Sequence, residues 1–216
     1  MKPRAVIAGA TGLTGRALLA EMARRDCYSE VTALTRHRVN DLTDCRQLVC
    51  AFDALPALPP ADHAFCCLGT TIKTAGSRAA FRKVDFDYVI NFAHAAKQAG
   101  AQQFHVISAL GAHASSTVFY SQTKGQMEDA VAAINFDAVH IYRPSLLLGD
   151  RQETRAGERI GIGIASLLSP LLVGPARKYK PVAVNTLANA MLNTAQQPTA
   201  GVCVHESNTI EALAKR

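Results

Sequence analysis

The sequence lacks the residue spacings that mark metal sites and disulfide frameworks. Its six cysteines show no CxxC spacing, and its seven histidines form no HxH or HExxH cluster. We therefore expect no bound metal. Cys66 and Cys67 are adjacent in an apolar stretch, so on a strand their side chains should point to opposite faces. This pattern favours reduced thiols in a cytoplasmic protein over a set of disulfides.

The sequence also lacks a long apolar run and a block of like charges. The longest apolar stretch, 160–173, is interrupted by two serines and a proline and is too short to span a bilayer. The net charge is +6, from 23 basic and 17 acidic residues, and the basic residues are scattered apart from short groups at 36–38 and 177–180. We therefore expect no nucleic-acid partner and no membrane association. We also expect no targeting segment before the first strand, which favours a cytoplasmic location.

The N-terminal segment does carry a specific pattern. Residues 5–8 are apolar and run directly into glycines at 9, 12 and 15, and a helical pattern covers 12–24. Such a strand–turn–helix unit is typical of a dinucleotide-binding crevice, because glycine allows the tight turn, the close approach of the pyrophosphate and the close packing of the helix. The alternative is a plain glycine-rich turn. The predicted phosphate cradle comprises Gly9, Thr11, Gly12, Leu13, Thr14 and Gly15.

Apolar strand patterns alternate with helical patterns along the whole chain. The predicted strands are 5–8, 31–35, 47–50, 63–68, 104–108, 138–142 and 202–205, and the predicted helices are 12–24, 77–100, 120–134, 160–172, 184–195 and 209–215. The helix over 77–100 should be broken or bent near Val84, and 149–157 should form a loop. This alternation predicts an α/β fold of the Rossmann type, a doubly wound parallel sheet with helices on both faces. We expect one domain over 1–216, to which 145–216 contributes a small substrate-side lobe.

Residues after the later strands extend the predicted cofactor site. Arg36 follows the strand 31–35, where NAD-binding proteins usually place a carboxylate for the ribose 2′-hydroxyl. A guanidinium there suits a 2′-phosphate, so NADP(H) is favoured and NAD(H) is the second candidate. A solvated loop arginine is the alternative reading of Arg36. The other predicted cofactor contacts lie at the ends of two further strands, where backbone can approach the ribose or lie beneath the nicotinamide: Leu68, Gly69, Thr70, Arg143 and Pro144.

Three further residues form a candidate catalytic set. Tyr120 and Lys124 are four residues apart on a predicted helix, so their side chains share a face. A nearby ammonium lowers the pKa of a phenol and makes it usable for acid/base chemistry. Ser108 ends the preceding strand, so its hydroxyl should hold a substrate oxygen against the tyrosine. Otherwise Tyr120 is a half-buried aromatic residue and Lys124 a surface charge. Asp85 and Asn91 could support the site through a buried hydrogen bond, or be solvated or capping residues.

These segments together resemble a known family. The Gly9, Gly12, Gly15 spacing and the segments 67–71, 83–89, 120–125, 143–148 and 150–153 resemble the extended or atypical short-chain dehydrogenases/reductases, in particular the Tat-interacting-protein type. The resemblance covers nearly the whole chain. It implies an NADP(H)-binding Rossmann fold in which Tyr120 is the acid/base. It also implies that Lys124 lowers the pKa of Tyr120 and holds the nicotinamide ribose, and that Ser108 positions the substrate oxygen.

The function expected from these residues is hydride transfer between NADP(H) and a small carbonyl or alcohol. The cofactor carries the hydride chemistry, and the protein supplies orientation and proton transfer. The alternative is an NADP-binding sensor or regulator that acts through a protein partner. An NAD-using epimerase or dehydratase is a third candidate, which Arg36 disfavours. The sequence leaves open the substrate and the choice between a monomer and a homodimer.

Overall fold

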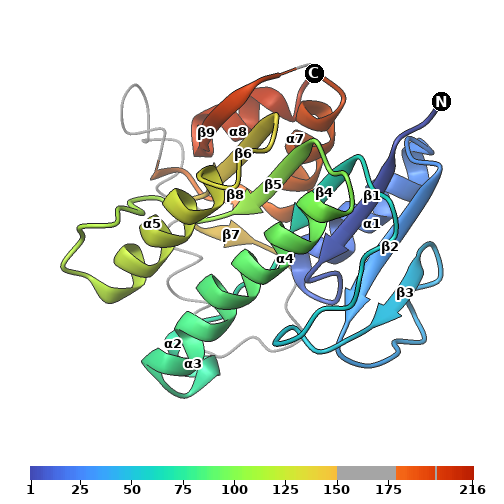
Figure 1. The fold of residues 1–216 in the computed structure, drawn as a ribbon. Coiled ribbons are helices and arrows are strands. Elements are labelled where there is room, and N and C mark those ends of the chain that lie inside the picture. Colours follow the sequence, from blue (N-terminus) through green and yellow to red (C-terminus); the bar gives the residue numbers. More distant parts are fainter. Residues whose placement is uncertain (150–178, 198) are drawn as a thin grey trace.

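The computed structural model describes residues 1–149, 179–197 and 199–216 (Figure 1). Its centre is a parallel sheet of seven strands in the order β3-β2-β1-β4-β5-β6-β9. The strands are β1 Arg4–Ala8, β2 Glu30–Thr35, β3 Arg46–Val49, β4 His63–Cys66, β5 Gln103–Ile107, β6 Ala138–Arg143 and β9 Gly201–Glu206. The predicted α/β class and parallel sheet are confirmed, and each of the seven predicted strands is present.

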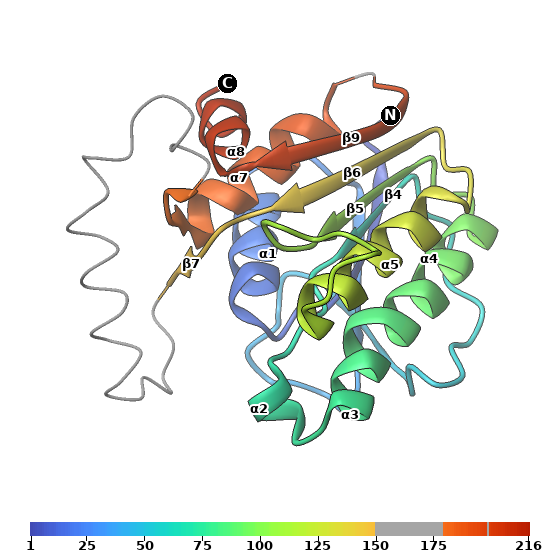
Figure 2. The ribbon, with the colours of Figure 1, turned by 90° about the vertical axis from the view of Figure 1, so that its left-hand side faces the viewer.

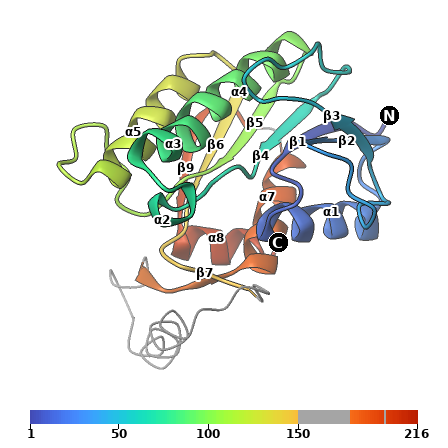
Figure 3. The same ribbon diagram turned by 90° about the horizontal axis from the view of Figure 1, so that it is seen from below.

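Helices cover both faces of this sheet (Figure 3). The helices α1 Leu13–Arg25, α7 Val184–Ala195 and α8 Ser207–Leu213 lie on one face, and α4 Tyr88–Gln98 and α5 Phe119–Ala132 lie on the other. Two short helices, α2 Ile72–Ala75 and α3 Arg78–Arg82, precede a π-helical turn, η1 Lys83–Asp87, which leads directly into α4. The bend predicted near Val84 is this π-helical turn.

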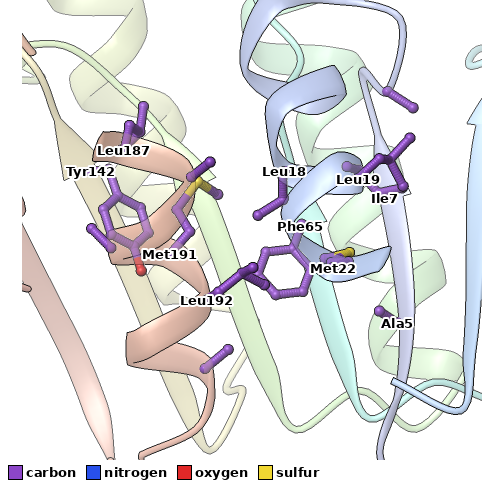
Figure 4. Close-up of a cluster of buried hydrophobic side chains, with 14 of the residues drawn as sticks. Ala5, Ile7, Leu18, Leu19, Met22, Phe65, Tyr142, Leu187, Met191 and Leu192 are labelled. Atoms are coloured by element: carbon purple, nitrogen blue, oxygen red, sulfur yellow. The ribbon is translucent and has the colours of Figure 1, made fainter. Parts of the chain in front are cut away.

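The core is divided by the sheet into two layers of apolar side chains. In one layer, α1 and α7 pack against each other over the sheet, so that Leu18 and Met22 of α1 approach Met191 and Leu192 of α7 with Phe65 between them (Figure 4). The other layer lies under α4 and α5. Cys66 belongs to this second layer and Cys67 packs against the first, which confirms that the two side chains point to opposite faces.

The C-terminal part completes the main sheet. β9 pairs with β6 along its whole length, from Ala138↔Gly201 to Arg143↔Glu206. Beyond the end of β6, a two-stranded sheet of β7 Leu147–Leu148 and β8 Val182–Ala183 extends outward (Figure 2); it was not predicted, because two-residue strands leave no periodic pattern. The predicted helix 160–172 and the loop 149–157, apart from Gly149, lie outside the described residues. The boundary of the predicted substrate-side lobe therefore stays a prediction.

A membrane-spanning helix and a metal-binding cluster are both absent from the described residues. None of the helices there combines the length and the apolar character needed to cross a membrane. Within the same ranges, no group of three or more His, Cys, Asp or Glu residues is arranged to hold a metal ion.

Candidate functional site

The strand order reverses between β1 and β4, and the glycine turn lies at this point. Gly9 follows β1 with φ +83°, and a Cβ there would lie 2.5 Å from the carbonyl carbon of Cys67. A Cβ on Gly15 would lie 2.2 Å from the carbonyl oxygen of Gly9. Glycine is therefore required at both positions, for the left-handed turn and for the close seating of α1. Gly12 is exposed, and a Cβ there would lie 3.4 Å from the carbonyl oxygen of Gly9, so glycine keeps the backbone at this point accessible to a ligand.

Two adjoining cavities lie at the carboxyl ends of the strands around this turn, with volumes of about 470 Å³ and 370 Å³. A ligand crevice at the switch point is the usual arrangement in open α/β sheets. Twelve predicted site residues line it: Gly9, Thr11, Gly12, Leu13, Thr14, Arg36, Leu68, Gly69, Thr70, Ser108, Tyr120 and Lys124. Arg36 lines the larger cavity, and the predicted catalytic residues Ser108, Tyr120 and Lys124 line the smaller one.

The structure brings the three candidate catalytic residues together on the wall of the smaller cavity. Ser108 directly follows β5, and its backbone N–H donates to the carbonyl of Tyr142 (2.7 Å). Its hydroxyl is buried and has no hydrogen-bond partner among the described residues. A buried hydroxyl without a partner is costly, and this one lines a cavity. The site is therefore suited to receive a polar ligand atom at Ser108.

Lys124 is buried and paired. Its ammonium lies 2.7 Å from Oδ1 of Asp85 and donates to the carbonyl of Ile107 (3.4 Å). The second oxygen of Asp85 accepts from the backbone N–H of Thr70 (2.9 Å). Of the two candidate supporting residues, Asp85 thus takes part in the site. Asn91 makes no contact with the candidate catalytic residues; its side chain donates to the carbonyl of Phe52 (3.0 Å), which lines the larger cavity.

The pKa of Tyr120 is raised above its ordinary value. Burial of the phenol is the largest cause, and the nearby Lys124 ammonium opposes it, while the Asp85 carboxylate adds to the rise. Lys124 lowers the pKa of Tyr120 as expected, but burial and the Asp85 carboxylate outweigh the ammonium, so the pKa as a whole is raised rather than lowered. The phenol is held in its protonated form, ready to donate a proton.

Three predicted cofactor residues are not part of the crevice lining in the described structure. Gly15 acts through packing, as described above. The guanidinium of Arg143 is directed at Glu128 of α5 and makes a two-point ion pair with it (Nε to Oε1, 2.9 Å). The carbonyl of Pro144 accepts from Leu110 N–H (3.0 Å). The sequence could not show that a carboxylate on a separate helix would face Arg143.

The cavity walls also contain residues that the sequence did not single out. They include Thr35, Phe52, Cys67, Tyr88 and Leu147. Phe52 and Tyr88 pack their rings against each other, with centroids 5.6 Å apart. They come from a loop and from the start of α4, so only the tertiary structure brings them to one wall. No local sequence signal identifies them.

The comparisons with known proteins identify the family of the chain. Residues 9–160 match the family model described as NAD(P)H-binding, and the chain belongs to this family. It is 37% identical over 203 residues to the rat (Rattus norvegicus) protein HTATIP2, covering 90% of this chain and 82% of the relative. It is 35% identical over 172 residues to the protein FMP52, mitochondrial, of Eremothecium gossypii, covering 78% and 76%. The predicted membership among short-chain-reductase-type proteins is confirmed.

Solved structures with the same fold bind dinucleotides. MoeE5 in complex with UDP-glucuronic acid and NAD superimposes with a TM-score of 0.70 at 17% identity, covering 93% of this chain and 75% of that one. The human epimerase family protein SDR39U1 (isoform 2) with NADPH gives a TM-score of 0.63 at 16% identity, covering 94% and 74%. At these identities the likeness establishes the Rossmann-type fold. The two structures contain different dinucleotides, so the likeness does not choose between NAD(H) and NADP(H).

Proposed function

We propose that this protein is an NADP(H)-dependent oxidoreductase that transfers hydride between the nicotinamide and a small carbonyl or alcohol. The observation that carries the proposal is the Ser108 hydroxyl, buried without a partner on the same cavity wall as Tyr120 and Lys124. A substrate oxygen would satisfy this hydroxyl and lie beside a protonated phenol. A protein that only sensed the dinucleotide would have no need of all three groups.

The crevice fits a dinucleotide. The glycine turn offers the N-terminus of α1 to the phosphates, and Gly69 and Thr70 form the facing wall. Thr35 presents a second buried hydroxyl without a partner among the described residues. The bound dinucleotide would supply or accept hydride. The NADP(H) preference is supported by Arg36, which lines the larger cavity with its side chain exposed.

Each catalytic residue has a distinct part in the proposed reaction. Ser108 donates a hydrogen bond to the substrate oxygen and fixes its position. Tyr120 gives its proton to that oxygen during reduction and takes a proton from the alcohol during oxidation. Lys124 stabilises the phenolate through its charge, and its ammonium is already fixed in place by Asp85.

The test is the consumption of NADPH with a panel of aldehydes and ketones. The wild type should oxidise NADPH with at least one of them, and Tyr120→Phe should lower kcat by about 10²–10⁴-fold, since the substitution removes the proton donor. NADPH binding should be unchanged in Tyr120→Phe, because the ring and its packing on Phe81 (5.4 Å between centroids) are retained.

A matched control is Tyr88→Phe. Tyr88 lines the larger cavity, and this variant should retain turnover. Equal turnover in Tyr120→Phe and the wild type would remove Tyr120 from the mechanism. Tight binding of NADPH without turnover of any carbonyl would instead favour the regulatory alternative, in which the dinucleotide state is read by a protein partner.

A further inference from the structure

Asp85 lies on the π-helical turn η1 and is directed into the molecule. Its side chain is 1% exposed, whereas its neighbours Lys83 and Asp87 are exposed. A π-helical turn inserts an extra residue into the helical repeat and so changes the direction of the side chains on it; such turns are frequent at functional sites. A carboxylate withdrawn from water is costly unless it is paired and hydrogen-bonded. The placement of Asp85 is therefore explained by its partners.

The two carboxylate oxygens bind two different parts of the crevice. Oδ1 lies 2.7 Å from the ammonium of Lys124, whose side chain is itself only 4% exposed. Oδ2 accepts from the backbone N–H of Thr70 (2.9 Å), in the turn that follows β4. One side chain thus connects the helix that carries Tyr120 with the turn that forms the opposite wall.

We infer that Asp85 is a positioning residue for the acid/base pair. Its charge keeps the buried Lys124 ammonium charged and fixed near Tyr120, and its second oxygen holds the Thr70 turn against the same site. The effect of Asp85 on catalysis rests on the proposed function, whereas its contacts with Lys124 and Thr70 do not depend on it.

The groups around Lys124 support this role. Burial alone lowers the pKa of the Lys124 ammonium, and the Asp85 carboxylate, helped by Tyr120, outweighs burial, so that the pKa is raised. Cys66 faces the pair from β4, and burial raises the pKa of its thiol to about 12, so it is neutral. Lys73 lies exposed on the same cavity. Asp85 is therefore the group that compensates the burial of Lys124, and without it burial should dominate.

The direct test is a pH titration of the lysine side chains by ¹³C NMR, on the full chain without cofactor or substrate. The Lys124 signal is assigned by its loss in Lys124→Met. In the wild type, Lys124 should titrate above the ordinary lysine value. In Asp85→Asn the amide oxygen can still accept from Thr70 but the charge is gone, so the titration of Lys124 should move to lower pH. Asp87→Asn, an exposed change on the same turn, should leave it unmoved.

Two results would overturn the inference. One is an unchanged Lys124 titration in Asp85→Asn. The other is a wild-type Lys124 that titrates below the ordinary lysine value, a result that does not depend on how well the variant folds.

Activity provides a second, separable readout. If the proposed function holds, Asp85→Asn should lower kcat by at least about tenfold while the KM for the carbonyl changes little. In addition, kcat should fall as the pH rises through the lowered pKa of Lys124. Rates and pH profiles equal to those of the wild type would count against the positioning role. An absence of turnover in the wild type would instead contradict the proposed function and leave the Lys124 titration to decide on Asp85.

Discussion

Thr35 and Arg36 stand side by side at the end of β2 and differ in exposure. Thr35 is 3% exposed, and its hydroxyl has no partner among the described residues, whereas Arg36 reaches into solvent. Both line the larger cavity. A buried hydroxyl beside an exposed guanidinium forms a polar place suited to a ribose that carries a phosphate. This combination is the residue-scale support for NADP(H).

Arg36→Ala should therefore weaken NADPH binding and leave NADH binding nearly unchanged. The loss should be about 10- to 100-fold in Kd, which corresponds to one charge-assisted contact to a phosphate. Titration calorimetry with both dinucleotides measures it. Arg38→Ala is the matched control, since Arg38 is also exposed but lines a different hollow around 38–47. Equal losses for NADPH and NADH would show that Arg36 does not distinguish the 2′-phosphate.

The burial of the Tyr120 side chain is a property that the sequence could not predict. The four-residue spacing to Lys124 predicted that the two groups would be neighbours, and both line one cavity. The spacing contained no information about burial, which dominates the pKa of the phenol. Desolvation depends on residues from several elements, such as Phe81 on α3, and these meet only in the folded chain.

At the scale of elements, the contact between α5 and the loop after β5 is unusually close. A Cβ on Gly125 would lie 2.2 Å from the backbone nitrogen of Ala114 and 2.2 Å from the carbonyl carbon of His113. The loop is also tied to α5 by a bond from His113 N–H to the carbonyl of Ser121 (3.1 Å). Gly125 follows Lys124 directly, so this contact fixes the loop next to the candidate catalytic residues.

Gly125→Ala should destabilise the protein although alanine favours helices. The gain in helix propensity is about 1 kcal/mol, but a methyl group 2.2 Å from backbone atoms forces the loop or the helix to move. We expect a net loss of about 1–3 kcal/mol in the free energy of unfolding, measured by urea denaturation. Asp129→Ala, an exposed change on the same helix, is the control. An unchanged stability of Gly125→Ala would show that the loop can yield at little cost.

The helical stretch from 78 to 98 illustrates the limit of periodicity at this scale. The sequence predicted one helix with a bend near Val84, and the structure has α3, η1 and α4 in direct succession. A search for a 3.6-residue repeat detects where a pattern shifts. It does not show that the shift is a π-helical turn or that this turn directs Asp85 at Lys124.

At the scale of the molecule, four buried histidines form a row across the sheet, one on each of four adjacent strands, on the face covered by α1 and α7. They are His63 on β4, His105 on β5, His140 on β6 and His205 on β9. The rings of His105 and His140 stack with centroids 4.7 Å apart, and His140 Nδ1 lies 3.1 Å from His205 Nε2. Burial lowers the pKa of all four, that of His140 to about 4.

This histidine row should make the protein sensitive to acid. In the unfolded chain each histidine takes up a proton near pH 6.5, whereas in the folded protein it does so only at lower pH. The unfolded state therefore binds more protons between these values, and the free energy of unfolding falls as the pH drops below about 6.5, by up to about 1.4 kcal/mol per pH unit for each histidine. Urea denaturation between pH 7.5 and pH 5 measures the slope. His140→Gln should make the dependence of the unfolding free energy on pH less steep. His94→Gln, an exposed change on α4, should leave the slope unchanged. Equal slopes in the wild type and both variants would refute the role of the histidine row.

Some whole-molecule expectations stay predictions. The cytoplasmic location is one of them, and the FMP52 relatives carry the word mitochondrial in their names. The expected monomer or homodimer and the alternative of a protein partner are likewise predictions.

The sequence by itself determined the class of fold, the glycine turn after the first strand and the neighbourhood of Ser108, Tyr120 and Lys124. These features depend on local properties: the alternation of apolar patterns, the steric freedom of glycine and the spacing of side chains along one helix. Only the tertiary structure decided that Asp85 forms an ion pair with Lys124 and that Glu128 forms one with Arg143. It alone also showed that burial sets the pKa of Tyr120. Charge pairing and desolvation depend on which elements meet in space, and segments distant in the sequence bring those groups together.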